Sequence, residues 1–170
     1  MYLSIDFNIL LATTPIPPCT PISVGFSSII YNASSGNQLN YECYAFLWIS
    51  NTTGFVNLTF ELQNKPFYWL IDDISVHNGA VEMLSNGGFE SGSLSPWIRS
   101  DPYGPCGGSA GRVDPQSPYT GSFHLFDGSD DCPDYISQSF RVTTGQIYTV
   151  SFWLQVKGTG PDITIVVSVS

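Results

Sequence analysis

The chain has few charged residues, and the basic ones are the rarest. Only 11% of its 170 residues are charged, with 5 Lys and Arg against 14 Asp and Glu, which gives a formal net charge of −9. So few cations cannot neutralise a run of phosphates, which disfavours nucleic-acid binding. Attachment to an anionic membrane surface is disfavoured for the same reason. Cations, neutral glycans and other protein surfaces remain as partners.

The sequence also lacks the patterns of a zinc site, a membrane span and a signal peptide. Its four cysteines form no CxxC pair and it has only two histidines, so a zinc site is not expected. No apolar run is long enough to cross a membrane as a helix, so no membrane insertion is expected. Residues 1–19 have no basic n-region and Asp6 interrupts their apolar run, so a secreted form would need a signal outside this sequence.

An even number of cysteines in a polar, charge-poor chain is typical of disulfides formed in an oxidising, extracellular compartment. Four cysteines allow three pairings. We predict Cys19–Cys43 and Cys106–Cys132, because each of these pairs closes a local loop. Three N-x-S/T sequons add candidate glycosylation sites, at Asn32, Asn51 and Asn57.

Strict alternation of apolar and polar residues dominates the chain. It is clearest over residues 3–9, 56–63, 147–156 and 163–170, and each of these segments predicts a half-buried strand of an antiparallel sheet. No stretch keeps a helical period for more than about two turns. Turn residues separate the strand patterns, so we predict an all-β fold, an antiparallel β-sandwich or jelly roll.

Three segments can be compared with a known family. They are "NGGFESGSLSPW" at residues 86–97, "ISQSFRVTTGQIYTVSFWL" at 136–154 and "FYWLIDDISV" at 67–76. They resemble the opening, middle and closing segments of carbohydrate-binding-module-like jelly rolls of the galactose-binding-domain type. The resemblance covers about half of the chain and implies a jelly-roll fold.

The order of these segments differs from the order in that family. Residues 1–77 resemble the C-terminal half of a jelly roll and residues 78–170 the N-terminal half, so together they make one jelly-roll equivalent. Three arrangements restore the family order. The chain is a circular permutant that closes on itself, a window cut from a tandem array, or a chain whose halves are completed by strands from neighbouring copies.

The resemblance also implies a structural calcium ion where the opening and closing segments meet. The matching positions are Glu90 and Asp73, with Asp72 as the second choice of aspartate. Calcium takes six to eight oxygen ligands, so these carboxylates would need backbone carbonyls beside them. The alternative is that they cap turns or accept hydrogen bonds from backbone amides.

Other chemistry-bearing residues favour no catalytic site. The segment "FDGSDDCPD" does not match a calcium-binding EF-hand loop, so it predicts a solvent-exposed acidic loop beside Cys132. "GGSAG" matches the serine-nucleophile pattern G-x-S-x-G, but its flanks predict a flexible loop around Ser109. His77 and His124 have no recognisable acid–base partner. We therefore expect no enzyme activity.

Aromatic side chains are the candidates for stacking on sugar rings. Trp69 and Trp97 fall within the family-like segments and are expected in the core. Trp153 is opposite an apolar row, so it is either exposed or covers the second sheet. The stacking candidates are the tyrosines expected in loops, Tyr103, Tyr119 and Tyr135.

Strand patterns that run to both ends of the chain favour assembly between copies. The leading hypothesis is an extracellular structural or adhesive module that assembles head-to-tail with other copies, by strand complementation, into a fibre or tandem array. The alternative is a monomeric, lectin-like module that binds glycans.

Overall fold

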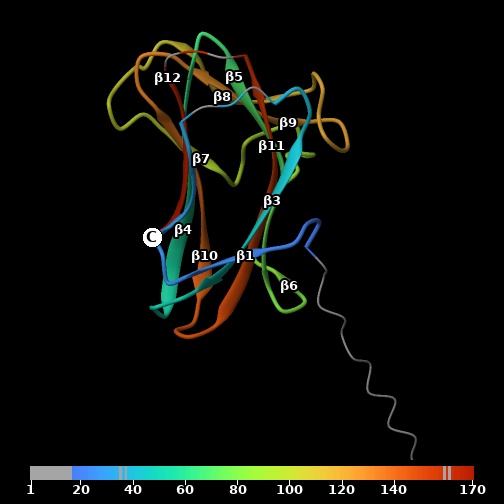
Figure 1. Cartoon of the computed structure of the whole chain (residues 1–170), viewed down its shortest axis with the longest axis vertical. Coiled ribbons are helices and arrows are strands. Elements are labelled where there is room, and N and C mark those ends of the chain that lie inside the picture. Colours follow the sequence, from blue (N-terminus) through green and yellow to red (C-terminus); the bar gives the residue numbers. More distant parts are fainter. Residues whose placement is uncertain (1–16, 35, 37, 159, 161) are drawn as a thin grey trace, which may run out of the picture.

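The computed structural model describes residues 17–34, 36, 38–158, 160 and 162–170. All regular structure in these residues is β-strand, and they contain no helix. The strands form two sheets that face each other (Figure 1). The predicted all-β, antiparallel β-sandwich is therefore confirmed, whereas the strand predicted at residues 3–9 lies outside the described residues.

The larger sheet, sheet A, has the strand order β1–β3–β11–β5–β9–β8, with β6 paired to one end of β5. Its pairs are antiparallel except for β1 with β3. Its strands are β1 (Ile22–Gly25), β3 (Glu42–Ile49), β5 (Tyr68–Asn78), β6 (Val81–Glu82), β8 (Gly108–Asp114), β9 (His124–Ser129) and β11 (Ile147–Lys157).

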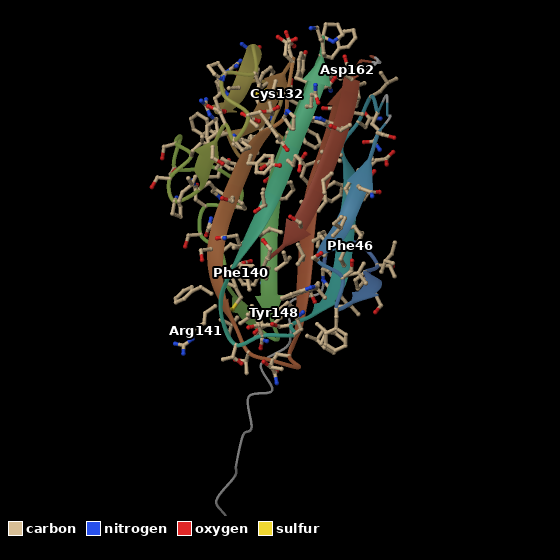
Figure 2. The ribbon with its side chains drawn as sticks, turned by 90° about the vertical axis from the view of Figure 1, so that its left-hand side faces the viewer. Phe46, Cys132, Phe140, Arg141, Tyr148 and Asp162 are labelled. Carbon is tan, nitrogen blue, oxygen red and sulfur yellow. A yellow bond between two sulfur atoms is a disulfide. The ribbon has the colours of Figure 1, made fainter. Side chains whose placement is uncertain are left out.

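The smaller sheet, sheet B, has the order β2–β12–β4–β10–β7, and all of its described pairs are antiparallel. Figure 2 views the sandwich from the side of this sheet, with β4 between β10 and β12. Its strands are β2 (Ile29–Ala33), β4 (Gly54–Lys65), β7 (Ile98–Ser100), β10 (Asp134–Val142) and β12 (Asp162–Val169).

The core between the sheets is made by the apolar faces of the alternating strands. Successive side chains of a strand point to opposite faces, so one face of each strand is buried. Burying each such side chain contributes about 1.5–3 kcal/mol. Trp69 and Trp97 are buried as predicted. The buried rows predicted from the sequence include Leu58, Phe60 and Leu62 of β4, Val150, Phe152 and Leu154 of β11, and Ile163, Ile165 and Val167 of β12.

Strands from the first and second parts of the sequence alternate within both sheets. In sheet A, β5 lies between β11 and β9, and in sheet B, β4 lies between β12 and β10. The strand β12 is hydrogen-bonded on both sides, to β2 and to β4 of the same chain. The described chain therefore forms one sandwich in which most strand neighbours are distant in sequence.

Both predicted disulfides are present, which confirms the pairing Cys19–Cys43 and Cys106–Cys132. The first joins the segment before β1 to β3, and the second joins the segment before β8 to the turn before β10. Two disulfides are consistent with an oxidising compartment. In the part of the chain that the structure describes, no helix is long and apolar enough to span a membrane.

Candidate functional site

A β-bulge interrupts the outer face of sheet A. Between the register pairs Ser75–Ser151 and Asp72–Trp153, two residues of β5 oppose one residue of β11. Asp73, inside the bulge, has a φ of 48°, in the left-handed region that non-glycine residues seldom adopt. Bulges are common next to functional sites, because they change where a side chain points. The strongest candidate site of the molecule lies beside this bulge.

Three aromatic side chains, Trp153, Tyr119 and Tyr41, form what we call the aromatic cluster. Tyr119, from the loop between β8 and β9, stacks on Trp153 with ring centroids 3.8 Å apart and an interplanar angle of 18°. Tyr41 packs against Tyr119 with a centroid distance of 5.5 Å, and its hydroxyl donates to the carbonyl oxygen of Ser117. Tyr119 is 39% exposed, so the cluster is accessible at the surface.

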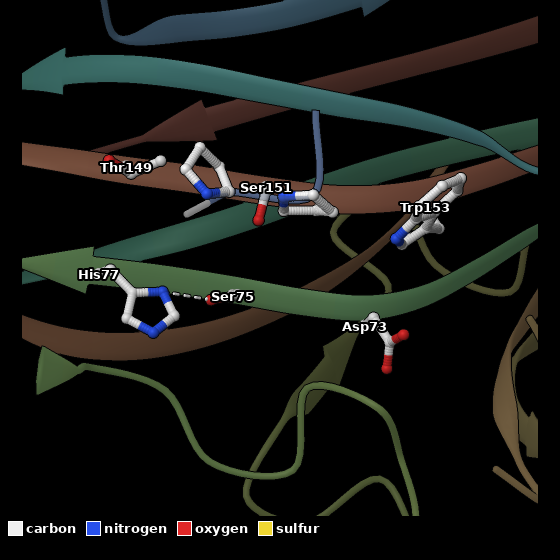
Figure 3. Close-up of a pocket in the computed structure, with 8 residues that line it drawn as sticks. Asp73, Ser75, His77, Thr149, Ser151 and Trp153 are labelled. Carbon is white, nitrogen blue, oxygen red and sulfur yellow. Dashed lines mark hydrogen bonds between the residues drawn. The ribbon is translucent and has the colours of Figure 1, made fainter. Parts of the chain in front are cut away.

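A pocket of about 210 Å³ lies beside Trp153 on the same face (Figure 3). Its floor is polar, because alternate residues of two paired strands point outward there. Those residues are Asp73, Ser75 and His77 of β5 and Thr149 and Ser151 of β11, and Pro17 and Pro18 also line the pocket.

Hydrogen bonds orient the polar groups at one end of this pocket. The Ser75 hydroxyl donates to Glu82 Oε2 at 2.5 Å and lies 2.7 Å from His77 Nδ1. Because the hydroxyl has only one proton to give, His77 Nδ1 donates to Ser75. In a neutral ring this makes Nε2 the acceptor. Glu82 is itself held by the backbone amides of Val76 and Met83.

Asp72 positions the loop that carries Tyr119. Its Oδ2 accepts hydrogen bonds from the backbone amides of Tyr119 and Thr120, at 2.9 and 3.1 Å, and its Oδ1 accepts one from the amide of Asp73 at 2.8 Å. The side chain is fully buried, and this burial raises the pKa of Asp72 to about 6, against the opposing effect of the amide bonds. One buried carboxylate thus ties the aromatic cluster to the bulge.

The carboxylates predicted to hold calcium are already engaged by protein donors. Glu90 accepts hydrogen bonds from the amides of Ser122 and Phe123, and Asp73 accepts them from the Thr120 hydroxyl. Among the described residues, no group of three or more Asp, Glu, His or Cys side chains is placed to hold a metal ion. Calcium takes six to eight oxygens, so these carboxylates would need backbone carbonyls beside them. These contacts agree with the alternative, carboxylates that accept hydrogen bonds from backbone amides and hydroxyls, and calcium stays a prediction.

The other two predicted stacking residues lie away from the aromatic cluster. Tyr103 and Tyr135 contact each other edge to face, with ring centroids 6.4 Å apart. Tyr135 belongs to β10 of sheet B, so its expected place in a loop is wrong. Of the three candidates, the structure places only Tyr119 in the aromatic cluster.

Two further expectations about loops are wrong. Ser109 lies in β8 and not in a flexible loop, because β9 pairs with its segment. The predicted acidic loop is solvent-exposed at Asp131, which forms an ion pair with Lys65 at 2.7 Å. However, Asp127 lies in β9 and Asp134 in β10, and both are fully buried, because strand alternation turns them toward the core.

Sequence reasoning missed Tyr41 and the polar floor of the pocket. A signal was present, since polar residues alternate at positions 73, 75 and 77 and at 149 and 151. It became informative only once β5 and β11 were known to be paired. The three sequon asparagines are exposed, as glycosylation would require: Asn32, Asn51 and Asn57.

No protein-family model matches the chain, and searches of curated proteins and of solved structures found no similar protein. Its function is therefore argued from the geometry of the site alone.

Proposed function

We propose that the chain is a glycan-binding module whose site is the aromatic cluster together with the pocket beside it. One observation carries the proposal: the stacked pair of Tyr119 and Trp153 borders a pocket with a polar floor. The C–H face of a sugar ring packs on an aromatic ring, while its hydroxyls need a few well-placed polar partners. Trp153 supplies the first kind of contact, and Asp73, Ser75 and His77 supply the second.

The lining residues favour an uncharged sugar. The described lining contains the Asp73 carboxylate, hydroxyls and one imidazole, but no Lys or Arg. An acidic sugar would meet the negative charge of Asp73 and of a chain whose formal net charge is −9. The volume of about 210 Å³ is below the roughly 300–1,000 Å³ of ordinary ligand pockets, so the pocket fits one ring of a glycan.

An extracellular location belongs to the same proposal. Two disulfides favour an oxidising compartment, and three exposed sequons would be available for glycosylation there. Neutral glycans of cell surfaces and matrices are accessible from that compartment. The proposal involves binding without catalysis.

A glycan array probed with the purified chain tests this function. We expect binding to neutral glycans, weakened at least about tenfold by Trp153→Ala or Tyr119→Ala, since each removes a stacking surface worth about 1.4 kcal/mol or more. Tyr103→Ala is the matched control, because it removes an exposed tyrosine outside the aromatic cluster. Absence of binding to every glycan, or equal losses in all three variants, would reject the site.

A second candidate function is self-assembly through an open sheet edge. Two edge strands, β1 of sheet A and β2 of sheet B, follow each other in the chain. They expose Ile22 (65%) and Ile29 (49%), and the connection between them exposes Phe26 (61%). Edge strands offer unpaired backbone groups to another chain, and exposed apolar side chains favour such pairing. The predicted donor segment, residues 3–9, lies outside the described residues.

Sedimentation and negative-stain microscopy of the concentrated chain test the assembly. We expect oligomers or filaments that Phe26→Lys prevents and that Phe55→Lys, an equally exposed substitution on β4, leaves intact. A monomer at every concentration would reject assembly without affecting the glycan-binding proposal.

A further inference from the structure

Two aspartates are buried between the sheets. Asp127 is on β9 of sheet A and Asp134 is on β10 of sheet B, and the side chains of both are completely inaccessible to solvent. They lie at the end of the sandwich that the Cys106–Cys132 disulfide closes, since Asp134 follows Cys132 by two residues. Neither aspartate lines the pocket of the proposed glycan site or belongs to the aromatic cluster.

One oxygen of each carboxyl group has a donor, and the other has none. Ser129 donates its backbone amide to Asp127 Oδ1 at 3.1 Å, and Gly111 donates its amide to Asp134 Oδ2 at 2.8 Å. Asp127 Oδ2 and Asp134 Oδ1 are buried, and no described residue donates to either. Both carboxyl groups lie against Gly111, whose amide bonds Asp134 Oδ2 and whose added Cβ would lie 3.3 Å from Asp127 Oδ2. A proton between the two free oxygens would satisfy both.

No basic side chain among the described residues neutralises the pair. Arg99 of β7 pairs with Asp101 at 2.9 Å, so its charge acts on Asp127 only from a distance. Arg112 of β8 lies over the Phe126 ring and near Asp114. The remaining titratable groups on the neighbouring strands alternate with the core residues and lie on the other face of their strands: Glu61 and Lys65 on β4, Tyr68 on β5, His124 on β9 and Tyr135 on β10. Of these, His124 is fully buried, on the face of β9 opposite Asp127.

Two neighbouring carboxylates that are both ionised, away from water and without a cation, are strongly disfavoured. A divalent metal could neutralise them in principle, but magnesium takes six oxygens and calcium six to eight. Even with the Ser129 hydroxyl the pair offers about three free oxygens, and no third acidic side chain among the described residues joins it. A proton, which needs only the two facing oxygens, fits the donor set.

We propose that Asp127 and Asp134 share one proton, held between Asp127 Oδ2 and Asp134 Oδ1, and that this proton latches the β8–β9 hairpin of sheet A to β10 of sheet B. Burial, and next the neighbouring Asp134 carboxyl, raise the pKa of Asp127 well above its usual range. When the pH rises above the raised pKa, the proton leaves to solvent, and two buried carboxylates then repel each other across the sheets. The latch is therefore sensitive to pH.

The hairpin that the latch holds carries Tyr119 in its loop. Release of the latch would therefore loosen the aromatic cluster. Only the effect of this loosening on sugar binding rests on the proposed function. The shared proton itself is measured without any sugar, so failure of either proposal can be recognised separately.

Carboxyl ¹³C NMR of the folded chain tests the shared proton directly. We expect two aspartate carboxyl signals that share a titration step displaced well above the ordinary aspartate value of about 3.9. Assignment comes from Asp127→Asn and Asp134→Asn, each of which should remove this late titration, while Asp162→Asn, an exposed control, should not. If all carboxyl signals titrate below about pH 5, the shared proton is rejected, and this measurement on the wild-type chain stands even if a variant fails to fold.

Two accompanying measurements test the latch and distinguish the proton from a bound metal ion. The first is hydrogen exchange of the backbone amides of β8 and β9, corrected for the intrinsic pH dependence of exchange. Between pH 7 and about pH 9 the corrected rate should increase by a factor at least about three times larger in the wild type than in Asp127→Asn. Equal acceleration would reject the latch. If calcium or magnesium raises the Tm of the wild type but not of Asp127→Asn, the pair holds a metal and the proton proposal is overturned.

Discussion

Two groups of acidic side chains in this molecule are held in opposite ways. Near the bulge of β5, Asp72 and Glu90 each accept several backbone N–H hydrogen bonds, which favour the charged form of a carboxylate. In the core, Asp127 and Asp134 each accept one such bond, and the other oxygen of each has no donor among the described residues. The first group accepts hydrogen bonds from backbone amides and so holds loops in place. The second group needs a proton to satisfy its remaining oxygens.

The comparison shows that the same residue type has a different role according to the donors around it. Asp72 and Asp127 are both fully buried, so burial alone does not separate them. What differs is the number of amides aimed at each carboxyl group, three for Asp72 and one for Asp127. The following substitutions test that distinction, in order of decreasing expected effect.

Asp72→Ala should cause the largest loss of stability. It leaves three backbone amides without their acceptor, including those that hold the Tyr119 loop, and we expect the free energy of unfolding to fall by about 3 kcal/mol. Urea denaturation measures this change. Asp73→Ala is the control, since Asp73 accepts only from the Thr120 hydroxyl and should cost about 1 kcal/mol or less. Equal losses would show that the amide bonds of Asp72 contribute little.

The two groups should also differ in how stability depends on pH. The pKa of Asp72 is raised to about 6 and that of Asp127 well above its usual range, both mainly by burial. In each case the folded chain holds the proton more tightly than the unfolded chain, so stability falls as pH rises, by at most about 1.4 kcal/mol per pH unit for each proton.

The two aspartates lower the stability over different ranges of pH. The contribution of Asp72 begins near pH 4 and is complete not far above pH 6, whereas that of Asp127 continues to higher pH. Thermal unfolding as a function of pH should therefore show, at pH above the Asp72 step, a further decline that Asp127→Asn removes and Asp72→Asn retains. A decline that Asp72→Asn removes instead would reverse the assignment.

Two glycine substitutions compare the packing of the two groups. A Cβ at Gly111 would lie 2.6 Å from Ile136 Cδ1 and 3.3 Å from Asp127 Oδ2, inside a tightly packed core, so Gly111→Ala should cost about 2 kcal/mol. Gly121→Ala meets the Glu90 carboxyl group and has a φ of +61°, but Glu90 is exposed and can move aside, so we expect about 1 kcal/mol. Chemical denaturation ranks the two variants, and a larger loss for Gly121→Ala would mean that Glu90 is rigidly held.

Removal of divalent metals should have the smallest effect. Because protein donors engage Glu90 and Asp73, a chelator should change the Tm by no more than about 1 °C. Differential scanning calorimetry with chelator or added calcium measures this. A drop of several degrees that is absent in Glu90→Gln would support the calcium site that the resemblance implies.

Much of the fold could be predicted because it depends on local patterns. Alternation identified β4, β11 and β12 and the face that each one buries, and loop closure favoured the correct disulfides. The site could be predicted only in part, since Tyr119 was proposed for stacking but its partner Trp153 was left undecided. Their contact requires the β8–β9 loop to reach β11 across β5, which depends on sheet order and not on any nearby residue.

The acid pair shows the limit of composition as a guide. Four aspartates within eight residues, and a cysteine and proline among them, are typical of a solvated loop. The same eight residues include the end of β9 and the start of β10, so strand alternation determines which aspartates are buried. Only the positions of the two strand ends, which sequence patterns locate poorly, distinguish Asp127 and Asp134 from Asp130 and Asp131.

The position of β12 has a consequence for how the chain is made. Residues 162–169 are the last strand to be synthesised among those described, yet they lie between β2 and β4. During translation, β2 therefore has no partner on that side until these residues leave the ribosome. Sheet B therefore cannot be completed before residues 162–169 are available, and pairing over such sequence distances is slow. Until then the nascent chain exposes two open strand edges, so its dependence on chaperones should be greatest just before synthesis of this segment ends.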